Sequence, residues 1–145
     1  MRSRGRPGKG FLREFEWQAT GDPSAYLAAP DGVALLQEWG FPSVLAYMHG
    51  LAWEAGQLLT TSWGTTLETP RDMVGAMITV PLPERSGTTD DDARKLRLSL
   101  LVDDRIEVQL HAWRGRLWTR VSAQVYNDRS DIERLAEAVL RRPQP

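Results

Sequence analysis

Strict alternation of side-chain character predicts a β-strand over residues 118–127. One face of this strand carries Thr119, Val121, Ala123 and Val125, and the other carries Trp118, Arg120, Ser122, Gln124 and Tyr126. We expect the first face to join a hydrophobic core. Arg120 then lies on the second face among aromatic and neutral polar groups, and the run contains no carboxylate to neutralise it.

Two further segments show the same alternation. Residues 105–110 place Ile106, Val108 and Leu110 on one face, and the glycine-containing turn 113–116 connects them to the strand that carries Arg120. A short turn between two alternating runs predicts an antiparallel hairpin. Residues 73–82 form the third predicted strand, with a proline at its end, where a missing N–H is tolerated.

Apolar residues at three- and four-residue spacing predict the helices. Residues 24–29 open one helical stretch, which we expect Pro30 to interrupt or restart before it stops at Gly40. The longest helix begins at Pro42-Ser43, and its apolar positions are Val44, Leu45, Met48, Leu51, Ala52, Ala55, Leu58 and Leu59. Gly50 and Gly56 lie inside it and each cost about 1 kcal/mol relative to alanine, so tertiary packing must stabilise this helix.

Two more helices follow. The third begins after the acidic run 90–92, and its predicted buried positions are Ala93, Leu96, Leu100 and Leu101. The last begins with a capping-box pattern, Ser130-Asp131-Ile132-Glu133, and carries Arg141 and Arg142 in its final turn. The predicted order is helix, helix, strand, helix, strand, strand, helix. This order indicates an α/β (α+β) domain: a small, mostly antiparallel three-stranded sheet with helices packed on one face.

Composition narrows the function classes. The 145 residues suffice for one domain, and the net charge of −1 provides no bulk field for nucleic acid or an anionic membrane. The sequence has no cysteine and only two histidines, which excludes disulfides and thiolate chemistry and argues against a multi-histidine metal centre. No apolar run is long enough to cross a bilayer, and no signal peptide pattern opens the chain, so we expect a cytoplasmic protein.

Two charged segments have more than one interpretation. Residues 1–10 are rich in Arg, Gly and Lys, which predicts a flexible basic arm: a solvated tail, the edge of a shortened gene, or an arm that contacts nucleic acid. The run 90–92 is three aspartates, which suggests a metal site or negative charge at a helix N-terminus; we favour the second. Arg120 itself is a two-pronged donor suited to a carboxylate or phosphate, or else a solvated arginine on an open sheet.

Three segments together resemble a known family. They are FEWQATGDPSAYLAAPDGVALLQEWG, GAMITVPLP and RIEVQLHAWRGRLWTRVSAQVYNDRSDIERLAEAV. They resemble the carboxyl-terminal part of isopenicillin-N epimerase-like proteins, in the class V aminotransferase and cysteine desulfurase group of pyridoxal-phosphate (PLP) enzymes of fold type I. The resemblance runs from about Phe15 to about Arg142, and its most specific parts are R-V-S-A-Q-V-Y-N and the turn at residues 19–23.

The resemblance implies two site residues. Arg120 matches the arginine that binds the substrate α-carboxylate. Thr20 matches a threonine that reaches across a homodimer to the partner's PLP phosphate. Ala19 and Gly21 depart from the family's Gly-Thr-x-Asp-Pro turn, so the alternative for Thr20 is a hydroxyl that serves a turn or a helix N-cap.

The PLP-binding lysine is the part that the resemblance leaves unmatched. The chain's lysines, Lys9 and Lys95, lie in the basic arm and on a polar helix face, and neither matches the family's lysine motif. We therefore expect no catalytic residue here, no covalent PLP, and no activity of the chain alone.

The expected organisation is residues 1–10 as the arm, 11–40 as a remnant of the large domain with a linker helix, and 41–145 as the small domain. The large domain would precede residue 1 or be a separate chain. The alternative is a truncated, non-catalytic module for dimerisation or binding. The reaction stays open between epimerisation, transamination, desulfuration and carbon–sulfur lysis of an amino acid.

Overall fold

The computed structural model describes residues 21–142, and the chain divides into two units, Met1–Glu38 and Trp39–Pro145. The described part of the first unit is one helix, α2 (Ser24–Glu38), with no buried residue. Pro30 lies inside this helix, so the predicted interruption was wrong. Because no residue of α2 is buried, water can satisfy the carbonyl that proline leaves without a donor. Asp22 accepts a hydrogen bond of 2.9 Å from the N–H of Ser24 before the first turn.

Helix α3 (Phe41–Trp63) is the longest element of the second unit, as predicted. It begins after Gly40 and ends at Gly64, both with positive φ (80° and 67°), a backbone conformation that glycine adopts without a steric penalty. One stripe of the helix is buried: Val44, Leu51, Ala52, Ala55, Gly56, Leu59, Thr60 and Trp63. The helix therefore contributes its small and apolar side chains to the core.

The sheet has three antiparallel strands in the order β1-β3-β2: β1 (Met77–Pro81), β2 (Gln109–Trp113) and β3 (Arg116–Ser122). The predicted hairpin between the last two strands is confirmed. Its turn residues Arg114 and Gly115 have φ values of 50° and 73°, as a two-residue turn that follows the strand twist requires. Pro81 lies on β1, an edge strand, where its missing N–H costs no ladder hydrogen bond.

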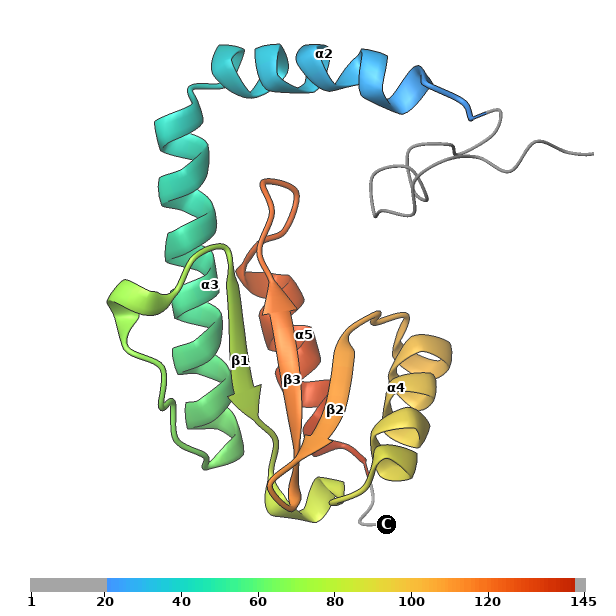
Figure 1. Cartoon of the computed structure of the whole chain (residues 1–145). Coiled ribbons are helices and arrows are strands. Elements are labelled where there is room, and N and C mark those ends of the chain that lie inside the picture. Colours follow the sequence, from blue (N-terminus) through green and yellow to red (C-terminus); the bar gives the residue numbers. More distant parts are fainter. Residues whose placement is uncertain (1–20, 143–145) are drawn as a thin grey trace, which may run out of the picture. The chain divides into compact units, whose positions relative to one another are not determined.

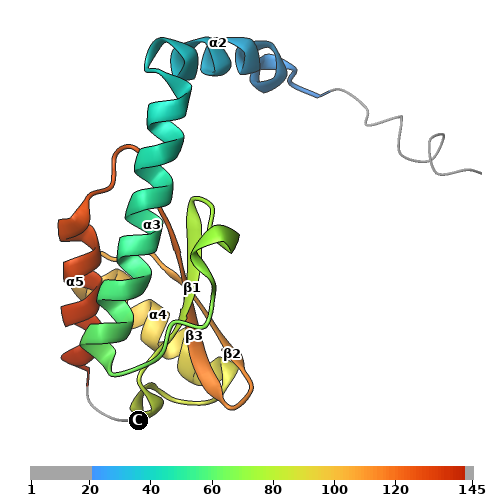
Figure 2. The same cartoon turned by 90° about the vertical axis from the view of Figure 1, so that its left-hand side faces the viewer.

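The helices α3 and α5 (Arg129–Leu140) pack together over one face of the sheet, and α4 (Asp90–Asp104) lies beside β2 (Figures 1 and 2). One core cluster joins all three helices to the inward residues of the strands, among them Ile78, Leu110 and Val121. This arrangement confirms the predicted fold class and the predicted order of elements. No helix within residues 21–142 combines the length and the apolar character needed to cross a membrane.

Strand boundaries differ from the prediction. Residues 105–108 are not part of the sheet, and β2 begins at Gln109. Arg105 terminates α4 in a left-handed conformation (φ 56°), and the N–H of Ile106 still bonds to the helix, at 2.9 Å from the carbonyl of Leu100. The chain therefore joins the sheet at Gln109 rather than at residue 105 as predicted. At the other end, β3 stops at Ser122. The N–H of Gln124 donates a hydrogen bond to the side-chain oxygen of Asn127 at 3.2 Å, which forms a turn after the strand.

Two helix details also differ. The capping box of α5 is formed by Asp128 and Asp131, not by Ser130 and Glu133, because the Asp128 carboxylate accepts from the N–H of Ser130 at 2.7 Å. Leu101, predicted to be buried, is 42% exposed. The helical period alone did not distinguish it from its buried neighbour Leu100.

Candidate functional site

Arg120 lies at the middle of the sheet, on the central strand. Its register partners are Thr79 of β1 and Gln109 of β2. The side chains of Thr119 and Val121, which alternate with Arg120, are buried against the helices. Alternation therefore directs Arg120 to the opposite face, as the sequence predicted.

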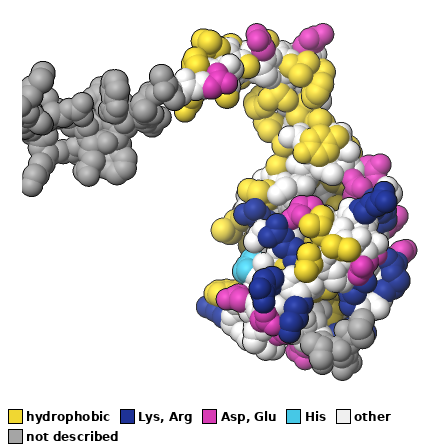
Figure 3. Space-filling view, turned by 90° about the vertical axis from the view of Figure 1, so that its right-hand side faces the viewer, with side chains coloured by type: hydrophobic (Ala, Val, Ile, Leu, Met, Phe, Trp, Pro, Cys, Tyr) yellow, Lys and Arg dark blue, Asp and Glu magenta, His cyan; other side chains and the backbone are white. Residues whose placement is uncertain are grey.

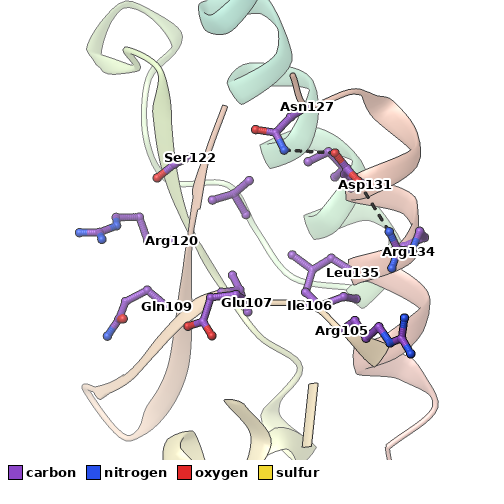
Figure 4. Close-up of a pocket in the computed structure, with 13 residues that line it drawn as sticks. Arg105, Ile106, Glu107, Gln109, Arg120, Ser122, Asn127, Asp131, Arg134 and Leu135 are labelled. Atoms are coloured by element: carbon purple, nitrogen blue, oxygen red, sulfur yellow. Dashed lines mark hydrogen bonds and ion pairs between the residues drawn. The ribbon is translucent and has the colours of Figure 1, made fainter. Parts of the chain in front are cut away.

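That face has no described helix over it. Arg120, Gln109 and Ser122 are exposed on it, and Met77 of β1 is 54% exposed. Figure 4 shows Arg120, Gln109 and Ser122 on one side of β3, and Asp131, Arg134 and Leu135 of α5 on the other. We call the exposed face around Arg120 the open face. Its side chains are available to a ligand or a partner.

The side chain of Arg120 has no hydrogen bond or ion pair with any residue from 21 to 142. Glu107 lies in the segment before β2, two residues before Gln109. Arg97 of α4 holds this carboxylate, with Nε at 3.0 Å and Nη2 at 2.5 Å from Oε1. Because Arg97 already neutralises Glu107, the charge of Arg120 is left for an incoming anion.

Aromatic side chains lie at the hairpin end of the open face. The rings of Trp113 and Trp118 meet edge to face with centroids 5.3 Å apart, and Trp118 Nε1 donates to the carbonyl of Trp113 at 3.0 Å. The guanidinium groups of Arg114 and Arg116 lie 4.3 Å and 5.9 Å from the Trp113 and Trp118 ring centroids. Attraction between cations and aromatic faces stabilises this end of the hairpin, so these two arginines already have partners.

A pocket of about 460 Å³ lies where β2 leaves β3, next to α5. The N–H of Ala123 donates to Ala76 at 2.8 Å, so odd-numbered residues of β3 bond to β1 and even-numbered residues face β2. Since Gln109–Arg120 is the final pair with β2, the backbone of Ser122 has no β2 partner in the described chain. Arg120 borders this pocket, but Figure 4 shows its side chain pointing away from α5. The open face is therefore the better place for a ligand of Arg120.

The segment after β3 is fixed to two helices. Asn127 Nδ2 donates to Asp131 of α5 at 3.1 Å, and the hydroxyl of Tyr47 of α3 donates to the Asn127 carbonyl at 2.6 Å. These contacts give the Q-V-Y-N part of the motif a structural role that the sequence did not reveal. They hold the end of the strand that carries Arg120.

The other predicted site residues do not join Arg120. Thr20 and Lys9 lie outside the described residues. Lys95 is exposed on α4, and its Nζ lies 2.7 Å from Asp91. The hydrogen bond and charge of Asp91 raise the pKa of Lys95 above its ordinary value. A protonated, solvated amine is a poor partner for PLP, so the described residues do not fit a covalent PLP site.

The acidic run 90–92 serves the start of α4, as favoured from the sequence. Asp92 accepts from the N–H groups of Thr88 and Thr89, both at 3.0 Å, and closes a capping box with Thr89. These hydrogen bonds lower the pKa of Asp92. Residues 21–142 contain no cluster of His, Asp and Glu suited to a metal ion.

Comparison with known proteins identifies the class of enzyme to which the chain is similar. No family model matches the chain. The chain is nevertheless similar over about nine-tenths of its length to enzymes of the class V aminotransferase-like, PLP-dependent group, which confirms the resemblance stated from the sequence.

Three relatives illustrate the similarity. The Arabidopsis thaliana protein named Probable L-cysteine desulfhydrase, chloroplastic, is 34% identical over 91% of this chain and 30% of its own length. L-cysteine desulfhydrase of Arabidopsis thaliana is 31% identical over 91% of the chain and 33% of its own length. Isopenicillin N epimerase of Streptomyces clavuligerus is 33% identical over 88% of the chain and 31% of its own length. The chain thus spans about a third of the length of these relatives.

Proposed function

We propose that the chain is the substrate-carboxylate-binding domain of a PLP-dependent, class V aminotransferase-like enzyme that acts on an amino acid. The observation that carries the proposal is Arg120: an exposed guanidinium at the centre of a sheet, without a protein partner among the described residues. The resemblance assigns the same residue to the α-carboxylate. Chemistry and sequence therefore point to one side chain.

A guanidinium can donate two parallel hydrogen bonds to one carboxylate, which fixes the orientation of an amino acid as well as its position. Orientation matters because the bond that reacts must be held in a defined direction. The rigid support comes from the neighbours of Arg120 in the sheet and from the ties of Asn127 to α3 and α5. In this proposal, Arg120 binds and orients the substrate, and it does not take part in the bond-breaking step.

PLP and its lysine would come from the remainder of a complete enzyme, as a large domain in the same polypeptide or a separate chain, within a homodimer. Thr20 is the residue that we propose to approach the PLP phosphate of the partner protomer. The substrate is an amino acid; epimerisation and desulfhydration are the reactions that the relatives' names suggest.

One observation favours a second candidate, a non-catalytic module for dimerisation or binding. The start of the second unit exposes large apolar side chains, including Trp39 (52%), Phe41 (45%) and Leu45 (46%). Figure 3 shows hydrophobic side chains gathered over the upper end of α3, above a region with charges of both signs. Apolar patches of this kind are typical of association surfaces.

Binding of L-alanine to the isolated chain tests the proposal. The Nε–Hε resonance of Arg120 is followed by NMR in the wild type, with Arg120→Lys compared against Arg114→Lys as a matched control on the same hairpin. We expect the Arg120 resonance to shift with ligand, and only Arg120→Lys to weaken binding, because lysine lacks the planar fork. An unperturbed Arg120 resonance, or equal effects of both substitutions, would favour the non-catalytic module.

A further inference from the structure

We infer that Gln109 is a second binding residue for the same carboxylate and that its neutral side chain keeps the site open for an anion. This inference rests on the proposed role of Arg120 and extends it to a residue that neither the sequence pattern nor the resemblance singled out. The ligand class is the carboxylate group of an amino acid.

Position is the first argument. Gln109 and Arg120 are direct register partners and exchange backbone hydrogen bonds, an arrangement that places their Cα atoms about 5.5 Å apart. Both side chains are exposed, and Figure 4 shows them projecting in the same direction from neighbouring strands. A carboxylate held by the guanidinium therefore has one oxygen within reach of the Gln109 amide.

Lack of a competing partner is the second argument. The backbone carbonyl of Gln109 accepts from the hydroxyl of Thr119 at 3.2 Å, but its side-chain amide has no hydrogen bond to any residue from 21 to 142. Thr79, the partner of Arg120 on the other side, is likewise without a side-chain hydrogen bond within that range. The side chains of Gln109 and Thr79 thus flank the guanidinium of Arg120, and none of the three has a side-chain partner among the described residues.

Charge is the third argument. A cross-strand partner of an arginine is a favourable place for a carboxylate, because opposite charges across a ladder attract. The carboxylate lies instead at Glu107, in the segment just before β2, where Arg97 holds it. A glutamate at position 109 would form an ion pair with Arg120 within the same chain and so block the guanidinium from a ligand. Glutamine avoids that internal pair and still supplies an N–H donor.

The test is acetate binding to the full chain, followed by NMR through both the Arg120 Nε–Hε and the Gln109 side-chain amide resonances. In the wild type we expect both resonances to move with a single dissociation constant. Gln109→Ala should weaken binding roughly fivefold, the loss of one hydrogen bond. Gln109→Glu should abolish binding. Gln57→Ala, at an exposed glutamine of α3, should bind as the wild type does.

Two negative results separate the claims. If acetate shifts Arg120, while the Gln109 amide stays unperturbed and Gln109→Ala and Gln109→Glu both bind normally, the inference about Gln109 is overturned and the role of Arg120 stands. If acetate leaves the Arg120 resonance unchanged in the wild type, the proposed carboxylate site itself is refuted. Backbone amide spectra of each variant verify that the fold is intact.

Discussion

Helix α3 contains two interior glycines with opposite surroundings, and replacing each by alanine separates helix propensity from packing. A Cβ at Gly50 meets nothing within 4 Å, whereas a Cβ at Gly56 overlaps Cδ1 of Ile78 and lies 3.2 Å from Cδ2 of Leu67. Both substitutions gain about 1 kcal/mol of helix propensity. Overpacking at Gly56 costs about 1–3 kcal/mol in addition. We therefore expect Gly50→Ala to raise the free energy of unfolding and Gly56→Ala to leave it unchanged or lower it by up to about 2 kcal/mol.

Urea denaturation of the two variants, measured side by side, gives the difference directly, because the propensity contribution cancels. Ile78→Val removes the atom that an alanine at position 56 would overlap, so the double variant should lose less stability than the sum of the single changes. If Gly56→Ala proves as stabilising as Gly50→Ala, the close approach of α3 to β1 is wrong.

Three shorter predictions concern the turn, the helix caps and Lys95. Gly115→Ala should lower the free energy of unfolding by about 1 kcal/mol in a thermal scan, because φ at this position is 73°. Gly75→Ala is the control: Gly75 has open space around it and no positive φ, so the free energy of unfolding should stay nearly unchanged. The pKa of Asp128 is lowered from 3.8 by hydrogen bonds from Ser130, so its charged form stabilises the fold above pH 3.8, and this stabilisation disappears as pH falls through the lower folded-state pKa. Asp128→Asn keeps a cap without the charge; the stability difference from the wild type should therefore be constant near pH 7 and shrink below pH 3.8, and a difference independent of pH would contradict the cap assignment. PLP followed by borohydride should not label Lys95 stoichiometrically in peptide mass spectra, because Lys95 is solvent-exposed and paired with Asp91 rather than enclosed in a cofactor site. Stoichiometric labelling of Lys95 or Lys9 would refute the expectation that the chain carries no PLP-binding lysine.

The sequence predicted the sheet well because alternation leaves little freedom. Thr119 and Val121 had to face the helices once the strand formed, and that placed Arg120 on the other face. The turn at Arg114 and Gly115 followed from local chemistry in the same way. These features depend on neighbours within a few residues, which a sequence displays directly.

Other features depend on contacts between distant segments. Arg97 lies on α4 and Glu107 in the segment before β2, so their pairing, which keeps Glu107 from neutralising Arg120, could not be predicted from spacing. The ties of Asn127 to Tyr47 and Asp131 likewise need the tertiary fold. Asp128 was missed as the cap because Ser130 and Glu133 offered an equally good local pattern, whereas the helix begins at Arg129.

The most direct measurement of the central claim is the KM for the amino-acid substrate in a complete PLP enzyme that carries this chain as its matching third. Arg120→Lys is compared there with Arg114→Lys, and the PLP content of each enzyme is determined from its absorbance. If Arg120 holds the substrate carboxylate, only Arg120→Lys raises KM, by roughly 10- to 100-fold for the loss of a charged hydrogen-bond pair, with PLP content unchanged. An unchanged KM in a fully PLP-loaded Arg120→Lys enzyme would contradict the claim.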